Sequence, residues 1–310
     1  MKINNYYVGD NLSLLSQLKD ESIDCIYMDP PYNTGRDFGD FVDKFESMYH
    51  FREFFIKPRI KELYRVLSNN GNLIVHVDPT ISHHVRIVMD EIFGEKKFVN
   101  EVAWVTGGNA KNKKKMNRWH DTIIIYKKSN KSVFNPIYLP YDKEYEKKNN
   151  VKICTIRNEK YVTTAAHNSQ PDVNPRINLR YEWMGNKRQW YLSKKKMQEM
   201  HDDNRLEYSE KTKIPRIKRY LSEMDGVPIR DVWSDIKNMQ AKEKLDYATQ
   251  KPVALLERIV KMFSNEGDLV LDPFAGSGTT GRACINLARN YILFDISQKG
   301  QEKFLESIDK

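Results

Sequence analysis

The sequence predicts an α/β fold built on a mostly parallel β-sheet. Short apolar segments alternate with amphipathic ones, which is the order that a parallel sheet with crossover helices requires. Two of the apolar segments, near opposite ends of the chain, finish with a carboxylate and a proline, Asp29-Pro30 and Asp272-Pro273. Strands buried on both faces are apolar throughout, and open α/β sheets bind their ligands at the carboxyl ends of such strands.

The first 128 residues are predicted to follow the order β-α-β-α-β-α-β-β, and the closing ββ pair implies one antiparallel edge. Gly- and Asp-rich residues 33–45, which include Phe38 and Phe41, are expected to form a lid-like loop over the strand ends. The expected strands are 6–10, 22–29, 72–77, 100–105 and 122–126, and the expected helices are 11–18, 49–67 and 81–93.

The alternation stops over residues 129–232, where short polar pieces are separated by prolines. We interpret this segment as a smaller inserted domain. Residues 106–230 hold 28 Lys and Arg against 14 Asp and Glu, whereas the rest of the chain is slightly acidic. A basic segment of this kind is either a solvated surface or a surface that binds a polyanion.

The alternation returns after residue 232. A helix is predicted to start within 246–252 and to run to Phe263, with Pro252 in its first turn, where a missing amide costs little. Strands at 269–272 and 291–295 then flank a helix over 279–288. The last 78 residues therefore complete the same α/β pattern that the first 128 begin.

The composition limits the class of protein. The chain has 310 residues, 40% of them hydrophobic, and a mean hydropathy of −0.70. With no apolar run near 18 residues and no signal-peptide pattern, we expect a cytoplasmic protein without membrane contact. The three cysteines lack metal-ligand spacing, so we expect no metal and reduced thiols.

The tetrad Asp29-Pro30-Pro31-Tyr32 follows the most apolar strand. Two prolines remove two amide donors and stiffen the bend, which leaves a carboxylate, free carbonyls and one aromatic face. This set suits a planar base with an amino group: Asp29 and the Pro30 carbonyl would accept its two N–H hydrogens while Tyr32 stacks on the ring. The tetrad alone is also compatible with a turn that has no chemistry.

The second stretch runs from Asp272 to Gly278 and precedes a helix. Gly276 and Gly278 would allow close approach of the backbone, and the helix start offers unpaired N–H groups. A dinucleotide site is a rival interpretation. The glycine spacing differs from Gly-x-Gly-x-x-Gly and no phosphate-directed basic residue follows, which favours a nucleoside cofactor without a pyrophosphate.

Together, the tetrad, the Asp272–Gly278 stretch and Thr249-Gln250-Lys251-Pro252 resemble the amino-methyltransferases of DNA. The order, tetrad first and cofactor glycines last, is similar to the permuted β group, and the tetrad resembles those of type III modification subunits and related solitary enzymes. The resemblance covers roughly 1–128 and 240–300. It implies a Rossmann-like, circularly permuted sheet of seven strands, in which 269–272 is first, 291–295 second, 6–10 third and 24–29 fourth.

The resemblance also implies roles for these segments. Residues 1–128 would be the catalytic half, 129–232 a target-recognition insertion, and 233–310 the cofactor-binding half. S-adenosylmethionine would be the cofactor, and Asp29, Pro30, Pro31 and Tyr32 the catalytic residues. Asp10 would face the cofactor adenine, or only cap the helix that follows; Lys251 would close the methionine end, or cap its own helix. The remaining cofactor residues would be Thr249, Asp272, Pro273, Phe274, Gly276, Ser277, Gly278, Thr279 and Asp295.

The activity implied is methylation of adenine N6 in duplex DNA, with the base flipped out of the helix. Aspartate in the first tetrad position is more typical of adenine N6 than of cytosine N4 enzymes. A catalytically silent DNA-binding relative and a methyltransferase for RNA or protein glutamine are the rival classes. Double-stranded DNA is the expected partner, and the family also allows a homodimer and a cognate restriction endonuclease. The lysine-rich loop 111–118 would contact the DNA backbone, and His120 is interpreted as structural.

Overall fold

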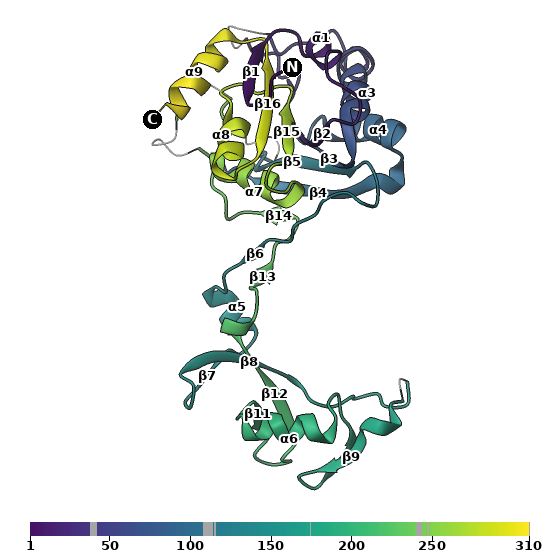
Figure 1. Cartoon of the computed structure of the whole chain (residues 1–310), viewed down its shortest axis with the longest axis vertical. Coiled ribbons are helices and arrows are strands. Elements are labelled where there is room, and N and C mark those ends of the chain that lie inside the picture. Colours follow the sequence, from purple (N-terminus) through teal and green to yellow (C-terminus); the bar gives the residue numbers. More distant parts are fainter. Residues whose placement is uncertain are drawn as a thin grey trace. The chain divides into compact units, whose positions relative to one another are not determined.

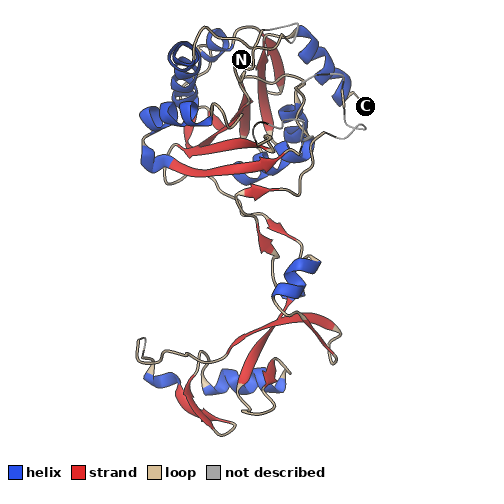
Figure 2. Cartoon of the chain, turned by 180° about the vertical axis from the view of Figure 1, so that it is seen from behind, coloured by secondary structure: helices blue, strands red, loops and turns tan. Residues whose placement is uncertain are grey.

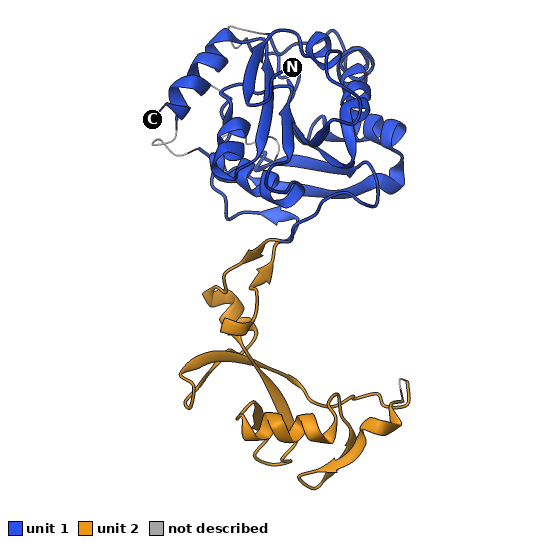
Figure 3. Cartoon of the chain, in the orientation of Figure 1, with its two compact units in different colours: residues 1–136, 230–310 blue, residues 137–229 orange. Residues whose placement is uncertain are grey.

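A computed structural model describes residues 1–37, 42–107, 114, 116–173, 175–239, 244–245, 247 and 249–309. The chain forms two compact units, shown in different colours in Figure 3. Unit 1 combines residues 1–136 with 230–310, and unit 2 comprises residues 137–229. Unit 2 therefore lies, in sequence, between the two parts of unit 1.

Unit 1 contains an eight-stranded sheet in the order β1-β16-β15-β2-β3-β5-β4-β14. Strands are drawn in red in Figure 2. Its pairs are parallel except those of β5, which runs antiparallel to both neighbours. This confirms the predicted mostly parallel α/β sheet. The strands are β1 (Asn5–Val8), β2 (Ile23–Met28), β3 (Leu67–Val77), β4 (Phe98–Val105), β5 (His120–Lys127), β14 (Val232–Trp233), β15 (Leu269–Asp272) and β16 (Asn290–Asp295).

The expected count of seven strands was wrong by one. Residues 232–233 add a short strand that pairs with Ala103 and Trp104 at the edge of the sheet. Nothing in the sequence marked it, because two residues are too few to show a strand period.

Strands that come from opposite ends of the chain lie side by side in this sheet. Purple β1 pairs with yellow β16 in Figure 1, and β15 pairs with β2 through Val270 and Leu271. Since β2 and β15 are parallel neighbours, the carboxylates that follow or end them emerge at the same edge of the sheet. This pairing positions the site described below.

Helices pack around this sheet in two groups. Within each group, neighbouring helices contact each other. One group consists of α1 (Asn11–Leu15), α3 (Lys57–Val66) and α4 (Ser82–Phe93), and the other of α7 (Val253–Phe263), α8 (Thr279–Asn286) and α9 (Gln298–Ile308). Apolar side chains of β2, β3, α3 and α4 form the main core. Helix α7 begins at Val253 with Pro252 as its N-cap, so Pro252 lies just before the first turn.

The single helix expected over 49–67 is three consecutive segments. These are α2 (Met48–His50), a π-helical turn η1 (Phe51–Ile56) and α3, followed directly by β3. Phe51 and Ile56 of the π-turn are buried in the core. A π-turn keeps nearly the same apolar face as an α-helix, so the sequence pattern could not distinguish them. A 3₁₀ turn η2 (Glu95–Lys97) follows α4.

Unit 2 has its own sheet and core. A four-stranded sheet, in the order β11-β12-β8-β7, lies beside the hairpin β9–β10 and helix α6, and Trp183, Trp190 and Met197 form the core. The elements are β6 (Tyr138–Leu139), α5 (Lys143–Lys148), β7 (Lys152–Cys154), β8 (Glu159–Ala165), η3 (Ile177–Leu179), β9 (Arg180–Trp183), β10 (Asn186–Gln189), α6 (Lys194–Asp202), β11 (Leu206–Tyr208), β12 (Pro215–Tyr220), η4 (Leu221–Glu223) and β13 (Val227–Pro228).

Within the part of the chain that the structure describes, the helices are too short or too polar to span a membrane. All three cysteines are buried free thiols.

Candidate active site

A cavity of about 500 Å³ opens at the carboxyl ends of the central parallel strands. Its walls come from both ends of the chain, and Tyr32 and Phe274 both line it. The predicted residues that line it are Asp29, Pro30, Pro31 and Tyr32 together with Asp10, Thr249, Lys251, Asp272, Pro273, Phe274, Gly276, Ser277, Thr279 and Asp295.

Gly278 is the predicted residue that does not line the cavity. It caps helix α8 with a left-handed backbone (φ +72°), and a Cβ there would lie 2.3 Å from the ring of Phe304. Its missing side chain therefore makes room for the packing of α9 on α8. Gly276 also has a left-handed backbone (φ +50°) but does face the cavity.

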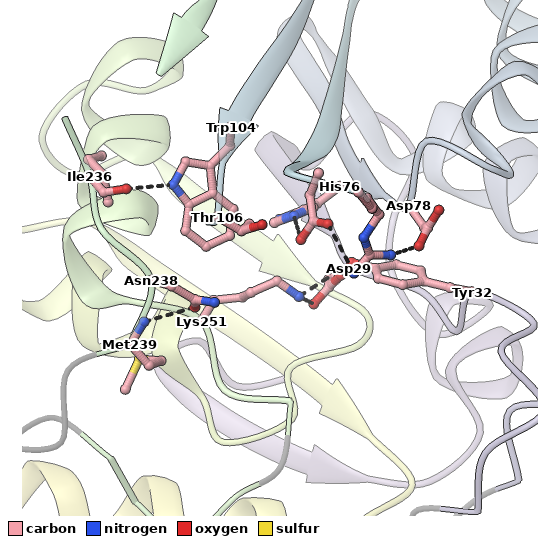
Figure 4. Close-up of polar contacts among 12 residues, drawn as sticks. Asp29, Tyr32, His76, Asp78, Trp104, Thr106, Ile236, Asn238, Met239 and Lys251 are labelled. Atoms are coloured by element: carbon pink, nitrogen blue, oxygen red, sulfur yellow. Dashed lines mark hydrogen bonds and ion pairs between the residues drawn. The ribbon is translucent and has the colours of Figure 1, made fainter. Parts of the chain in front are cut away.

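Asp29 is the centre of a compact polar group at one end of the cavity (Figure 4). The hydroxyl of Tyr32 donates to Asp29 Oδ1, and the ammonium of Lys251 pairs with Asp29 Oδ2. The same ammonium nitrogen lies 3.3 Å from the Tyr32 hydroxyl and 5.6 Å from the centroid of its ring. Burial, and then the charge of Asp29, raise the pKa of Tyr32, which keeps its hydroxyl protonated as a donor.

The loop after the tetrad is fixed by one buried carboxylate, that of Asp43. It accepts hydrogen bonds from the amides of Asn33 (2.7 Å) and Thr34 (2.9 Å) and from the Thr34 hydroxyl (2.6 Å). Asn33 and Gly35 adopt left-handed backbones, and the Gly35 amide donates to the Asp43 carbonyl. The wall beside Tyr32 is thus rigidly held. Phe38 and Phe41 of the expected lid lie outside the described residues.

For the methyl transfer that the sequence resemblance implies, we predict that Asp43→Asn lowers kcat by about 10-fold, because it weakens three hydrogen bonds that place the segment after Tyr32. Cofactor affinity should not change. Steady-state kinetics with a cofactor-binding titration tests this, with Glu46→Gln, an exposed acid three residues away, as the matched control. Equal kinetics in the two variants would remove the positioning role of Asp43.

Asp272 also lines the cavity and is 2% exposed. Its two oxygens accept from the Thr280 hydroxyl (2.5 Å) and the Phe274 amide (3.0 Å). Burial nevertheless raises the pKa of Asp272 to about 7, and the nearby charges of Asp29 and Asp295 add to this. A cation placed beside Asp272 would favour its ionised form.

Asp295 and Asp10 stand at the ends of β16 and β1. Asp295 accepts from the amides of Gly276 (2.8 Å) and Ser297 (2.9 Å), which ties the end of β16 to the glycine turn. Asp10 accepts a hydrogen bond from the Ser13 amide (3.1 Å) and so caps α1, which is one of the two roles expected for it from the sequence. It also lines the cavity. Its carboxylate remains half-exposed.

Arg59 and Asn11 form a brace that the sequence did not reveal. Arg59 Nε donates to Asn11 Oδ1 (2.8 Å), and Asn11 Nδ2 donates to the Pro273 carbonyl (2.9 Å). The guanidinium also stacks on Phe55, 3.9 Å from the ring centroid, and approaches Asp10 at 3.4 Å. Arg59 lies among ordinary surface-type charges of a helix in the sequence, so nothing indicated it. Asn11, next to Asp10, could have been included by its position after β1.

Beneath Asp29, a buried chain of polar groups joins three neighbouring strands. The Tyr27 hydroxyl bonds His76 Nδ1 (2.8 Å), and His76 Nε2 approaches Asp121 Oδ2 (3.3 Å). Burial lowers the pKa of His76, and the charge of Lys251 lowers it further, so its ring is neutral. Arg118 pairs with Asp78 and lies 3.7 Å from Asp121.

The lysine-rich loop is only partly described. Lys111, Lys113 and Lys115 lie outside the described residues, while Arg118 lines the cavity. His120 begins β5 and does not line it.

The chain matches the family model for DNA methylase over residues 23–306. A type II methyltransferase of Enterobacter cloacae, M.EcaI, is 28% identical over 95% of this chain and 67% of its own length. The Mod subunit of the type III enzyme StyLTI from Salmonella typhimurium is 27% identical over 95% of this chain but only 52% of its own length. The DNA adenine methyltransferase YhdJ of Escherichia coli is 25% identical over 97% and 81%.

Solved structures share the fold. A Thermus thermophilus protein described as a DNA modification methylase, complexed with S-adenosyl-L-methionine, superposes with a TM-score of 0.53 at 18% identity, over 98% of this chain and 92% of that one. The cytosine-N4-specific PvuII DNA methyltransferase gives 0.57 at 15% identity, over 97% and 84%.

Proposed function

The chain belongs to the DNA methylase family, and from this premise we propose that it transfers a methyl group from S-adenosylmethionine to the N6 amino group of an adenine flipped out of duplex DNA. The observation that carries the proposal is the shared cavity: Tyr32 and Phe274, from motifs at opposite ends of the chain, line one pocket. On this proposal the chain is a circular permutation of a methyltransferase domain, and residues 129–232 recognise the target.

The residues of the cavity fit S-adenosylmethionine. Asp10 and Asp295 offer carboxylates for ribose and adenine donors at the ends of adjacent strands, and the buried Asp272 suits a positively charged group. Gly276 lines the cavity, and a Cβ there would lie 3.2 Å from the ring of Tyr247. When bound, the cofactor would supply an activated methyl group on a sulfonium. Thr249, Pro273, Phe274, Ser277 and Thr279 would complete its surroundings.

The residues around Asp29 are arranged for an exocyclic amine. The amine nitrogen would form the new bond to the methyl carbon as the carbon–sulfur bond breaks, and the nitrogen would then release one proton to water. Asp29 and the Pro30 carbonyl would accept the two N–H groups, which favours positive charge on nitrogen. The flat face of Tyr32 would hold the ring in line. Pro31 keeps this bend stiff.

Aspartate at the first tetrad position supports adenine N6 over cytosine N4 as the target. Parallel incubations with tritiated S-adenosylmethionine and mixed duplex DNA, RNA or protein, followed by identification of the labelled nucleoside or amino acid, test this. Label in N6-methyladenine is expected. Label in N4-methylcytosine would correct the target base, label in RNA or protein alone would correct the substrate class, and no transfer would favour a silent DNA-binding relative.

Unit 2 supports the DNA-binding role through cations that lack acidic partners. Many of its basic residues are already neutralised: Lys152 pairs with Glu207, Lys160 with Glu146, and Arg205 with Glu223. Eleven further basic residues of unit 2 are candidates for contact with DNA, and two of them also have acidic partners: Arg180 pairs with Asp172 and Lys196 with Glu199. The other nine are Arg176, Lys187, Arg188, Lys194, Lys195, Lys213, Arg216, Lys218 and Arg219.

Arg188 and Arg216 stand out because the charges of both act on the same histidine. Burial lowers the pKa of His167, and the charges of these two exposed arginines lower it further. No carboxylate among the described residues pairs with either arginine. Arg216 is instead held by the Thr163 hydroxyl at 2.8 Å. Two uncompensated guanidinium groups on one surface suit a DNA phosphate.

Arg188→Ala and Arg216→Ala should each weaken DNA binding by about 10-fold at low salt and reduce the slope of log K against log salt by about 1. Fluorescence anisotropy across a salt series measures both quantities. Lys160→Ala, which removes a cation already paired at 2.7 Å, is the control and should change neither. Unchanged slopes in both arginine variants would exclude these residues from the DNA interface.

A further inference from the structure

Both oxygens of Asp29 are engaged in this structure (Figure 4), although the proposed chemistry requires this carboxylate to accept a hydrogen bond from the base. Tyr32 donates to Oδ1 and Lys251 pairs with Oδ2. The side chains of Lys251 and Asp29 are only 16% and 15% exposed, so water contributes little to their solvation.

The ammonium of Lys251 stands where an amino group would stand. It donates to the Asp29 carboxylate, lies 3.3 Å from the Tyr32 hydroxyl and approaches the ring of Tyr32 at 5.6 Å. A base stacked on Tyr32 with its amino group on Asp29 would place a nitrogen in the same surroundings. The lysine nitrogen and the base nitrogen therefore compete for Asp29 Oδ2.

We propose that Lys251 is a placeholder for the target amino group and that the carboxylate of the cofactor draws it away from Asp29. This inference rests on the proposed function. An ammonium left on Asp29 would oppose the positive charge that develops on the attacking nitrogen. A largely buried ammonium is also costly without an anion, so Lys251 needs a second partner before it can leave.

The cofactor offers such a partner. Its methionine part carries a carboxylate, and Lys251 lines the same cavity as Asp272, which is proposed to face a positively charged group of the cofactor. Lysine has a flexible four-carbon stem, which suits a group that exchanges between two anions. Lys251 is thus a positioning residue that makes Asp29 available only when the cofactor is bound.

This arrangement couples the two substrates. If the cofactor carboxylate removes the competitor from Asp29, bound cofactor strengthens capture of the base, and by linkage the DNA strengthens cofactor binding by the same factor. The target base must carry its amino group for the full effect, because a base without it does not compete for Asp29.

The test measures that coupling in the full chain. DNA affinity is titrated with and without S-adenosylhomocysteine, which keeps the carboxylate, using a duplex that contains the sequence identified from the methylated product. In the unaltered protein we expect about 10-fold tighter DNA binding with the ligand. Lys251→Met, which keeps the length of the side chain without its charge, should reduce this to less than about 2-fold. In the unaltered protein, the gain in DNA affinity should be smaller when purine replaces the target adenine. It should also be smaller when decarboxylated S-adenosylhomocysteine replaces the intact ligand.

Equal coupling in the unaltered protein and Lys251→Met would overturn the proposal, as would an absence of coupling in the unaltered protein. If Lys251→Met weakens S-adenosylhomocysteine equally with and without DNA, Lys251 is only a cofactor ligand and the placeholder role is wrong. Lys251→Arg, which keeps the charge, should retain part of the coupling and guards against a folding defect in Lys251→Met. Methyl transfer by the unaltered protein separates the two proposals. If the unaltered protein transfers no methyl group, the proposed function is contradicted. If it transfers methyl groups normally and Lys251→Met shows the same coupling as the unaltered protein, only the role of Lys251 is contradicted.

Discussion

Methyl transfer should fall by about 10³-fold in Asp29→Ala, because the variant loses the group proposed to accept the amine N–H and to stabilise charge on nitrogen. Asp29→Asn, which keeps the shape of the side chain, should lose nearly as much, since a neutral amide stabilises that charge poorly. The measurement is single-turnover transfer of a tritiated methyl group to duplex DNA. S-adenosylmethionine affinity should remain within a few-fold of the unaltered protein.

A double variant controls for the effect of leaving the buried ammonium of Lys251 unpaired. Removing Asp29 leaves Lys251 without its ion-pair partner, so a loss of activity could reflect local disorder. The double variant Asp29→Asn with Lys251→Met removes both charges and should be equally inactive while melting at a temperature close to that of the unaltered protein. Turnover within 10-fold of normal in either aspartate variant would remove Asp29 from the catalytic machinery.

Asp272→Asn should produce the second large effect, a loss of cofactor affinity of about 10- to 100-fold together with a change in the pH dependence of stability. The Asp272 pKa of about 7 lies above its ordinary value of 3.8. The folded state therefore holds a proton that the unfolded chain releases at lower pH. The contribution of this proton to the free energy of unfolding is fully present below pH 4. It is lost as the pH rises towards 7, by roughly 4 kcal/mol at most.

Asparagine at this position does not titrate, so the difference in Tm between Asp272→Asn and the ligand-free unaltered protein should rise from pH 5 to pH 8. Thermal melts across this range measure it. A positively charged ligand beside Asp272 should favour the ionised carboxylate, and calorimetry in buffers of different ionisation enthalpy should detect proton release on cofactor binding near pH 7. A difference in Tm that is independent of pH would contradict the titration of Asp272.

The sequence was informative about the parts of the fold that depend on strand pattern. Two apolar strands that end in Asp29-Pro30 and Asp272-Pro273 indicated that distant segments meet at one sheet edge, and β2 and β15 are indeed parallel neighbours. The positions of most predicted site residues followed, because the backbone at a strand end determines which cavity its next few residues face.

The parts that the sequence could not predict depend on side-chain direction or on loops. Lys251 was expected at the methionine end, but its long side chain reaches Asp29. Arg59 braces Asn11 from a helix whose charges all resemble surface charges in the sequence. Asp43 belongs to a loop without periodicity, and the sequence did not show that Gly278 makes room for Phe304. Such contacts become visible only when distant elements are placed side by side.

The most direct test of the central claim, that the cavity joining Asp29 and Asp272 methylates adenine in DNA, is single-molecule sequencing of DNA from cells that express the protein. The account predicts N6-methyladenine within one short sequence context in cells with the unaltered protein and its absence with Asp29→Asn. Unmodified DNA in both, modified cytosine, or the same adenine methylation with Asp29→Asn would contradict it.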